Sequence, residues 1–294
     1  MDFFLIDGYN MCFRAYYAMP ELTRGDGFPT GAIHAFFAGI LKLSSMDVPH
    51  STAIFFDRGG SVRHREAFAE YKANRSEMPE PMRLQMPEIM ELCRLMGFCV
   101  VVREGVEADD LLAAAAERLA AKGSSITIVS ADKDFAQLVR PGVRQLLPPS
   151  PQKQALGWRE LDMVGVKTKF GVPPSQIPDF LALVGDAADN IPGIEGVGPK
   201  TAAKWIKEFG GVESIIRRAD WIKPEKFRKI VAESAGKLRL NLDLVTLDRS
   251  ADTGEIACYP PDFDAVVAFL EKMEMKRSVS SFKKFAKEQY QTIL

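Results

Sequence analysis

The sequence predicts an α/β protein with a mostly parallel central sheet and flanking helices, followed by an all-helical region. Short apolar segments that suit buried strands alternate with amphipathic helical segments over the first half of the chain, a pattern typical of parallel sheets. After Pro148–Pro151 this alternation stops, and short helical segments separated by Gly and Pro continue without a convincing strand. We therefore expect an α/β domain over residues 1–164 and a helical region over residues 165–294.

The predicted strands and helices follow from local patterns. The strands are expected at Phe3–Ile6, Ala53–Phe56, Phe98–Val102, Ile126–Val129 and Val143–Leu147. Thr30 can cap a helix whose apolar residues recur three and four positions apart. A second helix opens with the acids of Glu107–Asp110 and ends at Gly123.

Composition excludes several classes of protein. Hydrophobic residues at 47% and charged residues at 26% are typical of globular proteins. The longest apolar runs fall far short of the ~20 residues of a membrane helix, and the N-terminus lacks the basic region and cleavage site of a secretory signal. Four cysteines without CxxC spacing and three histidines argue against a zinc site. We expect a reduced, soluble, cytoplasmic protein.

Acidic residues follow four of the predicted strands. They are Asp7, Asp57, Glu107, Asp109, Asp110, Asp132 and Asp134. The carboxyl ends of parallel strands share one edge of the sheet, where ligands bind in α/β proteins, so these side chains should lie close together. Further along the chain, Asp186 and Asp189 are three residues apart, which predicts that they share one face of a helix.

Each acid alone has another explanation, because an Asp after a strand can cap the next helix and acids in a first helical turn interact favourably with the helix dipole. Seven carboxylates at one sheet edge, however, would repel each other strongly without cations between them. Lys133 is the basic residue interleaved with them. Oxygen ligands without His or Cys suit Mg²⁺ or Mn²⁺. Two groups of acids indicate two ions, the arrangement that clamps a phosphodiester for in-line attack.

A glycine-rich turn precedes a basic helix in the second half of the chain. Pro199 suits the first position of this helix, which should end at Gly210. Free backbone N–H groups at its start could hold a phosphate, with Lys200 and Lys204 adding charge. An ordinary helical hairpin with solvated lysines is the alternative. Although the net charge of the chain is −1, residues 199–239 carry eleven Lys and Arg against five Asp and Glu.

A second basic segment lies between Arg58 and Pro81, the loosest part of the first domain. A helix from Val62 to Tyr71 is predicted there, and it could align Arg65 with Lys72. A run of charges of this kind is usually a solvated face. His64 is expected at the surface and not as a ligand.

Five segments resemble the flap endonuclease/5′→3′ exonuclease family in its bacterial form, the N-terminal domain of DNA polymerase I and the related phage 5′ nucleases. They are IDGYNMCFR (Ile6–Arg14), FFDRGGSVRHREAFAEYKANR (Phe55–Arg75), GVEADDLLA (Gly105–Ala113), SADKDFAQLV (Ser130–Val139) and LVGDAADNIPGIEGVGPKTAAKWI (Leu183–Ile206). Together they span most of residues 1–250 in the order that the family has.

The resemblance implies a fold and a set of site residues. A helical arch would cover about residues 58–81, and a helix–hairpin–helix-like region at about 186–240 would grip duplex DNA. The first of two Mg²⁺ ions, which Mn²⁺ could replace, would be held by Asp7, Asp57, Glu107 and Asp109, and the second by Asp132, Asp134, Asp186 and Asp189, with Asp110 nearby. Lys72, Arg75 and Arg14 would be catalytic, and Tyr71 would be a stacking platform. DNA and a K⁺ ion would be bound at Gly193, Gly196, Gly198, Lys200, Thr201 and Lys204.

The implied activity is hydrolysis of DNA at single-stranded 5′ flaps, nicks and 5′ ends, in primer removal and repair, by a monomer without a membrane partner. An RNA primer on DNA would be one substrate. Two alternatives are a catalytically silent protein that binds DNA junctions and another carboxylate-metal ribonuclease or phosphatase. The complete set of acids argues against the first, and the basic helical stretch, which suits a long polyanion, argues against the second.

Overall fold

The N-terminal part of the chain is built on a six-stranded sheet with the strand order β3-β2-β1-β4-β5-β6. The structure is a computed structural model that describes residues 2–46, 51–149 and 157–290. The strands are β1 (Asp2–Asp7), β2 (Ser51–Arg58), β3 (Cys99–Glu104), β4 (Ser125–Val129), β5 (Val143–Leu147) and β6 (Arg159–Leu161). The first five pair in parallel, and β6 runs antiparallel to β5. The mostly parallel sheet is confirmed.

Strand β6 lies beyond the Pro-rich segment, where no strand was predicted. It has three residues, two of them charged and exposed, so its sequence carries no apolar alternation. Its pairing with β5 comes from tertiary contacts, as is common for an edge strand.

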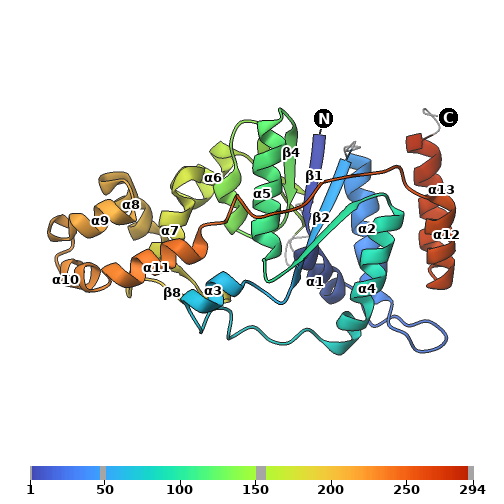
Figure 1. Ribbon diagram of the computed structural model, residues 1–294, viewed down its shortest axis with the longest axis horizontal. Coiled ribbons are helices and arrows are strands. Elements are labelled where there is room, and N and C mark those ends of the chain that lie inside the picture. Colours follow the sequence, from blue (N-terminus) through green and yellow to red (C-terminus); the bar gives the residue numbers. More distant parts are fainter. Residues whose placement is uncertain (1, 47–50, 150–156, 291–294) are drawn as a thin grey trace.

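Helices cover both faces of the sheet (Figure 1). On one face Phe4 and Ile6 pack toward α1 (Gly8–Ala18), α2 (Gly31–Met46) and α4 (Glu80–Leu95). On the other face Phe3 and Leu5 pack against α5 (Ala108–Ala121). Neighbouring residues of a strand point to opposite faces, so β1 is buried on both sides and its carboxyl end is fixed within the molecule.

A helical region follows the sheet, and its core around Trp205 and Phe180 continues to Leu147 and Leu161 at the edge of the sheet. Its elements are α6 (Met163–Phe170), η3 (Pro174–Gln176), α7 (Ile177–Val184), α8 (Pro199–Phe209), α9 (Val212–Arg217), η5 (Ala219–Trp221), α10 (Lys226–Glu233) and α11 (Ala235–Val245). Helices α8, α9 and α10 lie at one end of the long axis of the molecule (Figure 1). The described residues contain no helix long and apolar enough to cross a bilayer.

The last two helices return to the sheet domain. After α11 the chain runs along α5, where Leu247 is buried, to α12 (Phe263–Lys272) and α13 (Lys276–Tyr290) at the opposite end of the molecule (Figure 1). These helices pack against α2 and α4, and the rings of Phe37 and Phe282 lie 5.9 Å apart. The predicted division at residues 164 and 165 assigned them to the helical region, whereas their apolar side chains complete the core of the sheet domain.

The basic segment between β2 and α4 contains a shorter helix than predicted. Helix α3 spans Val62–Ala67, and Phe68 is extended. The following turns are held by contacts with a remote loop: Lys72 N donates to the carbonyl of Asp189 (3.0 Å), and Asn190 Nδ2 donates to the carbonyl of Glu70 (2.8 Å). These contacts hold Lys72 at φ +57°, which a continuing helix does not allow. The predicted helix from Val62 to Tyr71 is therefore wrong in its second half.

Candidate functional site

A pocket of about 430 Å³ opens at the carboxyl edge of the sheet. Asp7, Asp57, Asp109 and Asp132 line it together with Arg14, Lys72 and Arg75. The register explains the convergence, because Asp7 at the end of β1 lies beside Phe55 of β2 and Ile6 lies beside Val129 of β4. The prediction that acids after different strands share one edge is thus realised.

Asp7 and Asp57 are held by groups from neighbouring elements. Asp7 caps α1 by accepting a hydrogen bond from Asn10 N (3.0 Å), and its second oxygen accepts one from Ser130 Oγ (2.7 Å). Asp57 accepts a hydrogen bond from Ala108 N at the start of α5 (2.6 Å). Each carboxylate therefore keeps a fixed orientation while its remaining lone pairs are free to bind a cation.

Asp134, Asp186 and Asp189 form a second group, in which one oxygen of each lies within 4.8 Å of the others. Asp134 begins the 3-10 turn η1 (Asp134–Leu138). Asp186 caps the 3-10 turn η4 (Ala187–Asp189), and Asp189 is its last residue. The turn is closed by the two-residue strands β7 (Gly185–Asp186) and β8 (Ile191–Pro192). The turn brings the two acids together as predicted, although it is one 3-10 turn and not a longer helix.

The acids of the pocket carry a charge that the protein does not fully compensate. Burial, together with the charges of Asp132 and Asp57, raises the pKa of Asp7 to about 7. Burial and neighbouring carboxylates also raise the pKa values of Asp109 and Asp134. Asp134 Oδ1 is buried without a hydrogen-bond partner within the described structure. Oxygen ligands that are crowded, buried and partly unpartnered fit the binding of hard divalent cations.

Glu107, in contrast, lies among positive and hydrogen-donating groups. Its oxygens lie 2.7 Å from Lys72 Nζ, 3.0 Å from Tyr71 OH and 3.4 Å from His64 Nδ1. Burial alone would raise the pKa of Glu107, but His64 and Lys72 outweigh it and lower the pKa to about 2. Glu107 therefore stays ionised at every physiological pH.

Two basic residues of the 70–75 segment reach the acids from the far side of the pocket. Lys72 Nζ lies 3.7 Å from Asp189 Oδ2, and Arg75 Nη2 lies 2.5 Å from Asp189 Oδ1. Asn74 Nδ2 adds a hydrogen bond to the carbonyl of Ala187 (2.8 Å), which fixes the segment on the η4 turn. Lys72 and Arg75 thus face the pocket as the sequence predicts. Asn74 and Asn190, which hold them there, carry no sequence signal of their own, because their partners lie more than 100 residues away.

The remaining predicted residues of this region have different places. Tyr71 is 7% exposed and its hydroxyl donates to Glu107, so its ring is not a stacking surface and that prediction is wrong. Asp110 accepts a hydrogen bond from Asp248 N (2.8 Å), which ties down the chain after α11 and takes Asp110 out of the pocket lining. Arg14 Nη2 donates to the carbonyl of Pro149 at the pocket wall. Lys133 pairs with Asp186 at 2.8 Å.

His64 was expected at the surface and is 3% exposed. Ser61 caps α3 through the backbone N–H of His64 (3.1 Å), and the imidazole lies edge-on to Tyr71 with ring centroids 4.8 Å apart. Because its neighbours in sequence are charged, a surface position was the natural expectation. The ring is buried because it packs against Tyr71 and Glu107, contacts that single-sequence patterns do not reveal.

The glycine-rich turn leads into α8 as predicted. Gly198 precedes Pro199, the first residue of the helix, and Thr201 N bonds to the carbonyl of Gly198 (3.0 Å). Gly193 is required by close packing, because a Cβ atom there would lie 2.3 Å from the carbonyl oxygen of Val184. Gly196 has φ +75°. Lys200 and Lys204 are exposed, and neither forms an ion pair within the described residues. The turn therefore offers backbone N–H groups and free cations to an anion.

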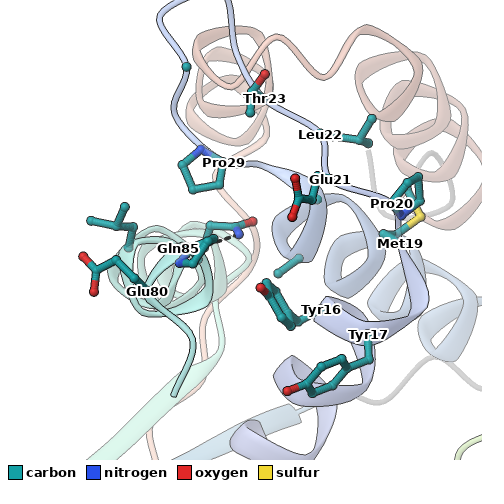
Figure 2. Close-up of a pocket in the computed structure, with 15 residues that line it drawn as sticks. Tyr16, Tyr17, Met19, Pro20, Glu21, Leu22, Thr23, Pro29, Glu80 and Gln85 are labelled. Atoms are coloured by element: carbon teal, nitrogen blue, oxygen red, sulfur yellow. Dashed lines mark hydrogen bonds between the residues drawn. The ribbon is translucent and has the colours of Figure 1, made fainter. Parts of the chain in front are cut away.

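Another pocket, of about 610 Å³, lies between the end of α1 and the start of α4. Figure 2 shows Tyr16 and Tyr17 on one side of it and Glu80 and Gln85 on the other. Most of its lining is apolar, and none of the residues predicted for catalysis or metal binding lies in it. We therefore place the functional site at the sheet edge.

The parallel sheet, its carboxylate-lined edge and the facing cations place the protein in the class of α/β proteins whose acidic site suits divalent cations beside a phosphate. Sequence comparison gives the family. The family model "5'-3' exonuclease, N-terminal resolvase-like domain" matches residues 2–171, and "5'-3' exonuclease, C-terminal SAM fold" matches residues 172–259. The chain belongs to the 5′–3′ exonuclease family.

Similar proteins agree with this assignment. A 5′–3′ exonuclease of Aquifex aeolicus is 35% identical over 99% of this chain and 98% of its own length. DNA polymerase I of Rhizobium leguminosarum is 36% identical over 92% of this chain, which spans 27% of that polymerase. The structure of the bacteriophage T5 D15 flap endonuclease in a complex with DNA and metal ions has the same fold, with a TM-score of 0.69 and 23% identity over 98% of this chain and all of that one.

Proposed function

We propose that this nuclease cleaves DNA at 5′ flaps and 5′ ends with two Mg²⁺ ions held at the carboxyl edge of the sheet. The observation that supports the proposal is the acidic pocket faced by Lys72 and Arg75, because its crowded carboxylates, which suit divalent cations, lie beside side chains that can bind a phosphate. The similarity to a T5 flap endonuclease solved with DNA and metal ions supports the choice of substrate.

The protein would divide the acids between the two ions. Asp7, Asp57, Glu107 and Asp109 would hold one, and Asp132, Asp134, Asp186 and Asp189 the other. When bound, such ions activate a water molecule and stabilise the charge that develops on the scissile phosphate. Asp110, whose hydrogen bond goes to Asp248, belongs to neither set.

Lys72 and Arg75 would bind the non-bridging oxygens of the scissile phosphate. Their present partners are Glu107 and Asp189. Burial alone would lower the pKa of Lys72, but Glu107 and Asp189 outweigh burial and raise it, so Lys72 is a charged ammonium beside these carboxylates. A cation held this way stabilises charge and does not transfer protons. Arg14, at the wall of the pocket, would add a further positive charge.

Duplex DNA would be held by the turn from Gly193 to Gly198 and by Lys200, Thr201 and Lys204, with K⁺ as the monovalent ion at this turn. Backbone N–H groups at the start of α8 and the two free lysines suit consecutive phosphates of one strand. We propose a monomer, with RNA primers on DNA among its substrates. The cytoplasmic location inferred from composition stays a prediction; the four cysteines are free thiols, consistent with it.

The decisive experiment uses a 5′-labelled flap DNA incubated with the protein and Mg²⁺, with and without EDTA. We expect a product cut near the junction of flap and duplex only when Mg²⁺ is free. Binding without cleavage in Mg²⁺ and in Mn²⁺ would instead identify a silent junction-binding protein. Preference for an RNA lacking a duplex would identify a ribonuclease.

A further inference from the structure

Trp221 is the most exposed large apolar residue of the described structure, at 74%. It lies at the end of η5, between α9 and α10. The turn beneath it is rigid, since Ala219 and Ile222 are buried and Arg228 Nε donates to the carbonyl of Ile222 (3.0 Å). The fold therefore presents an indole to solvent on a fixed support. A single exposed apolar residue is common, so its surroundings decide what it means.

The surroundings of Trp221 are strongly basic. Residues 217–229 carry six Lys and Arg against two Asp and Glu. Arg218 and Lys223 are exposed, and in the part of the chain that the structure describes neither pairs with a carboxylate. Arg218 and Lys223 flank the η5 turn that carries the exposed indole, and Trp221 N donates to the carbonyl of Arg218 (2.9 Å). Exposed cations and an aromatic ring on one turn match one class of ligand in particular, because nucleic acids combine phosphates with flat bases.

The η5 turn belongs to the same rigid unit as the glycine-rich turn. A Cβ atom at Gly196 would lie 3.4 Å from the ring of Phe227 on α10. Trp205 Nε1 on α8 donates to the carbonyl of Lys223 (3.4 Å). Lys237 Nζ donates to the carbonyl of Gly193 (2.9 Å). A nucleic acid held at the glycine-rich turn, as the proposed function has it, therefore lies on the module that also carries Trp221.

We infer that Trp221, Arg218 and Lys223 form a second nucleic-acid site, which binds unpaired nucleotides of a single strand. The two cations would bind consecutive phosphates, and a base would stack on the indole. Within a duplex both faces of each base are covered by its neighbours, so stacking on a side chain selects unpaired bases. This site lies in the helical region, away from the acidic pocket. It depends on the proposed function in one respect, namely that duplex DNA is bound at the neighbouring glycine-rich turn.

The test measures binding of a short oligothymidylate to the protein of residues 1–294 in EDTA, where no cleavage takes place. Trp221→Ala should weaken binding about tenfold, the loss of one stacked base, whereas Trp221→Phe should stay within about threefold because it keeps an aromatic face. Tyr259→Ala is the matched control, since Tyr259 is an aromatic residue 70% exposed outside the basic cluster. It should leave binding unchanged.

Two further ligands separate stacking from simple charge attraction. An abasic oligonucleotide of equal length and a blunt duplex should bind the parent and Trp221→Ala equally. Oligothymidylate should quench the indole fluorescence of the parent, and Trp221→Phe should lose this quenching while Trp158 and Trp205 remain.

Equal losses for the abasic strand and the duplex, or no loss for oligothymidylate, would overturn the inference. Failure of the parent to cut flaps would contradict the proposed function and leave these binding data intact.

Discussion

The acidic pocket and the basic surface of the helical region hold their charges in opposite ways. In the pocket, carboxylates are buried and oriented by hydrogen bonds, as Asp7 is by Asn10 and Ser130. On the helical region, Lys200, Lys204 and Arg218 are exposed to solvent and form no ion pairs among the described residues. Buried charges interact strongly but cost stability, while exposed charges cost little and are screened by salt. The pocket is thus built for chemistry and the helical surface for affinity.

The largest effect that this comparison predicts follows from changing one acid of the second group, Asp134. Asp134→Asn should lower the single-turnover rate of flap cleavage by ~10³-fold or more, while flap affinity in Ca²⁺ changes less than twofold, because the carboxylate places charge and does not dock DNA. Asp262→Asn, at the N-cap of α12, removes an equal charge far from the pocket and should have no effect on the rate. Near-native turnover of Asp134→Asn would refute the assignment of a metal ion to the second group of acids.

A smaller loss of rate is expected on the cationic side of the pocket. Lys72→Ala should lower single-turnover cleavage by ~10²-fold, the scale of losing one oriented electrostatic partner. The Kd for flap DNA should change by less than about tenfold. Lys122→Ala, at the C-terminal end of α5, is the control. A rate for Lys72→Ala within threefold of the parent would make Lys72 a structural partner of Glu107 and nothing more.

On the helical surface the expected effect is on salt dependence. Replacing Lys200 and Lys204 together by Ala should reduce the slope of log K against log salt by about 2, since each lost phosphate contact contributes roughly 0.9. The rate at saturating DNA should not change. The double variant Lys283→Ala with Lys284→Ala removes the same charge from α13 and should leave the slope as it is. If the slope of log K against log salt is unchanged in the Lys200 and Lys204 double variant, the glycine-rich turn has a purely structural role.

The smallest predicted effect concerns stability without metal. In the folded state Asp7 has a pKa of about 7, above its usual value of 3.8. Protonation of Asp7 therefore stabilises the folded state fully below about pH 4, and this stabilisation is lost as the pH rises through 7. In EDTA at pH 8, Asp7→Asn should therefore raise the free energy of unfolding by about 1 kcal/mol, with no gain at pH 4. Urea unfolding at both pH values measures it, and an equal gain at both would show that ionisation is not the cause.

Sequence patterns predicted the features that depend on neighbouring residues and missed those that depend on contacts between residues distant in sequence. Strands β1 to β4 carry largely apolar runs, and acids placed after them must meet at the sheet edge, so most of the pocket was predictable. The docking of residues 70–75 on the η4 turn depends on Asp189 and Ala187, over 100 residues away. The burial of His64 depends on Tyr71 and on Glu107, which single-sequence patterns do not pair with it. Strand β6 was not predicted for a similar reason, since it is defined by its pairing with β5 and not by its own sequence pattern.

The return of α12 and α13 to the sheet domain has a consequence for the order in which the protein can fold during synthesis. Synthesis proceeds from the N-terminus, and domains generally fold as units as they emerge. The apolar face of α2 and α4, however, meets Phe269 and Phe282 only after the entire helical region has been made. The sheet domain therefore leaves the ribosome with an uncovered apolar face, and helices made only after the helical region cover that face.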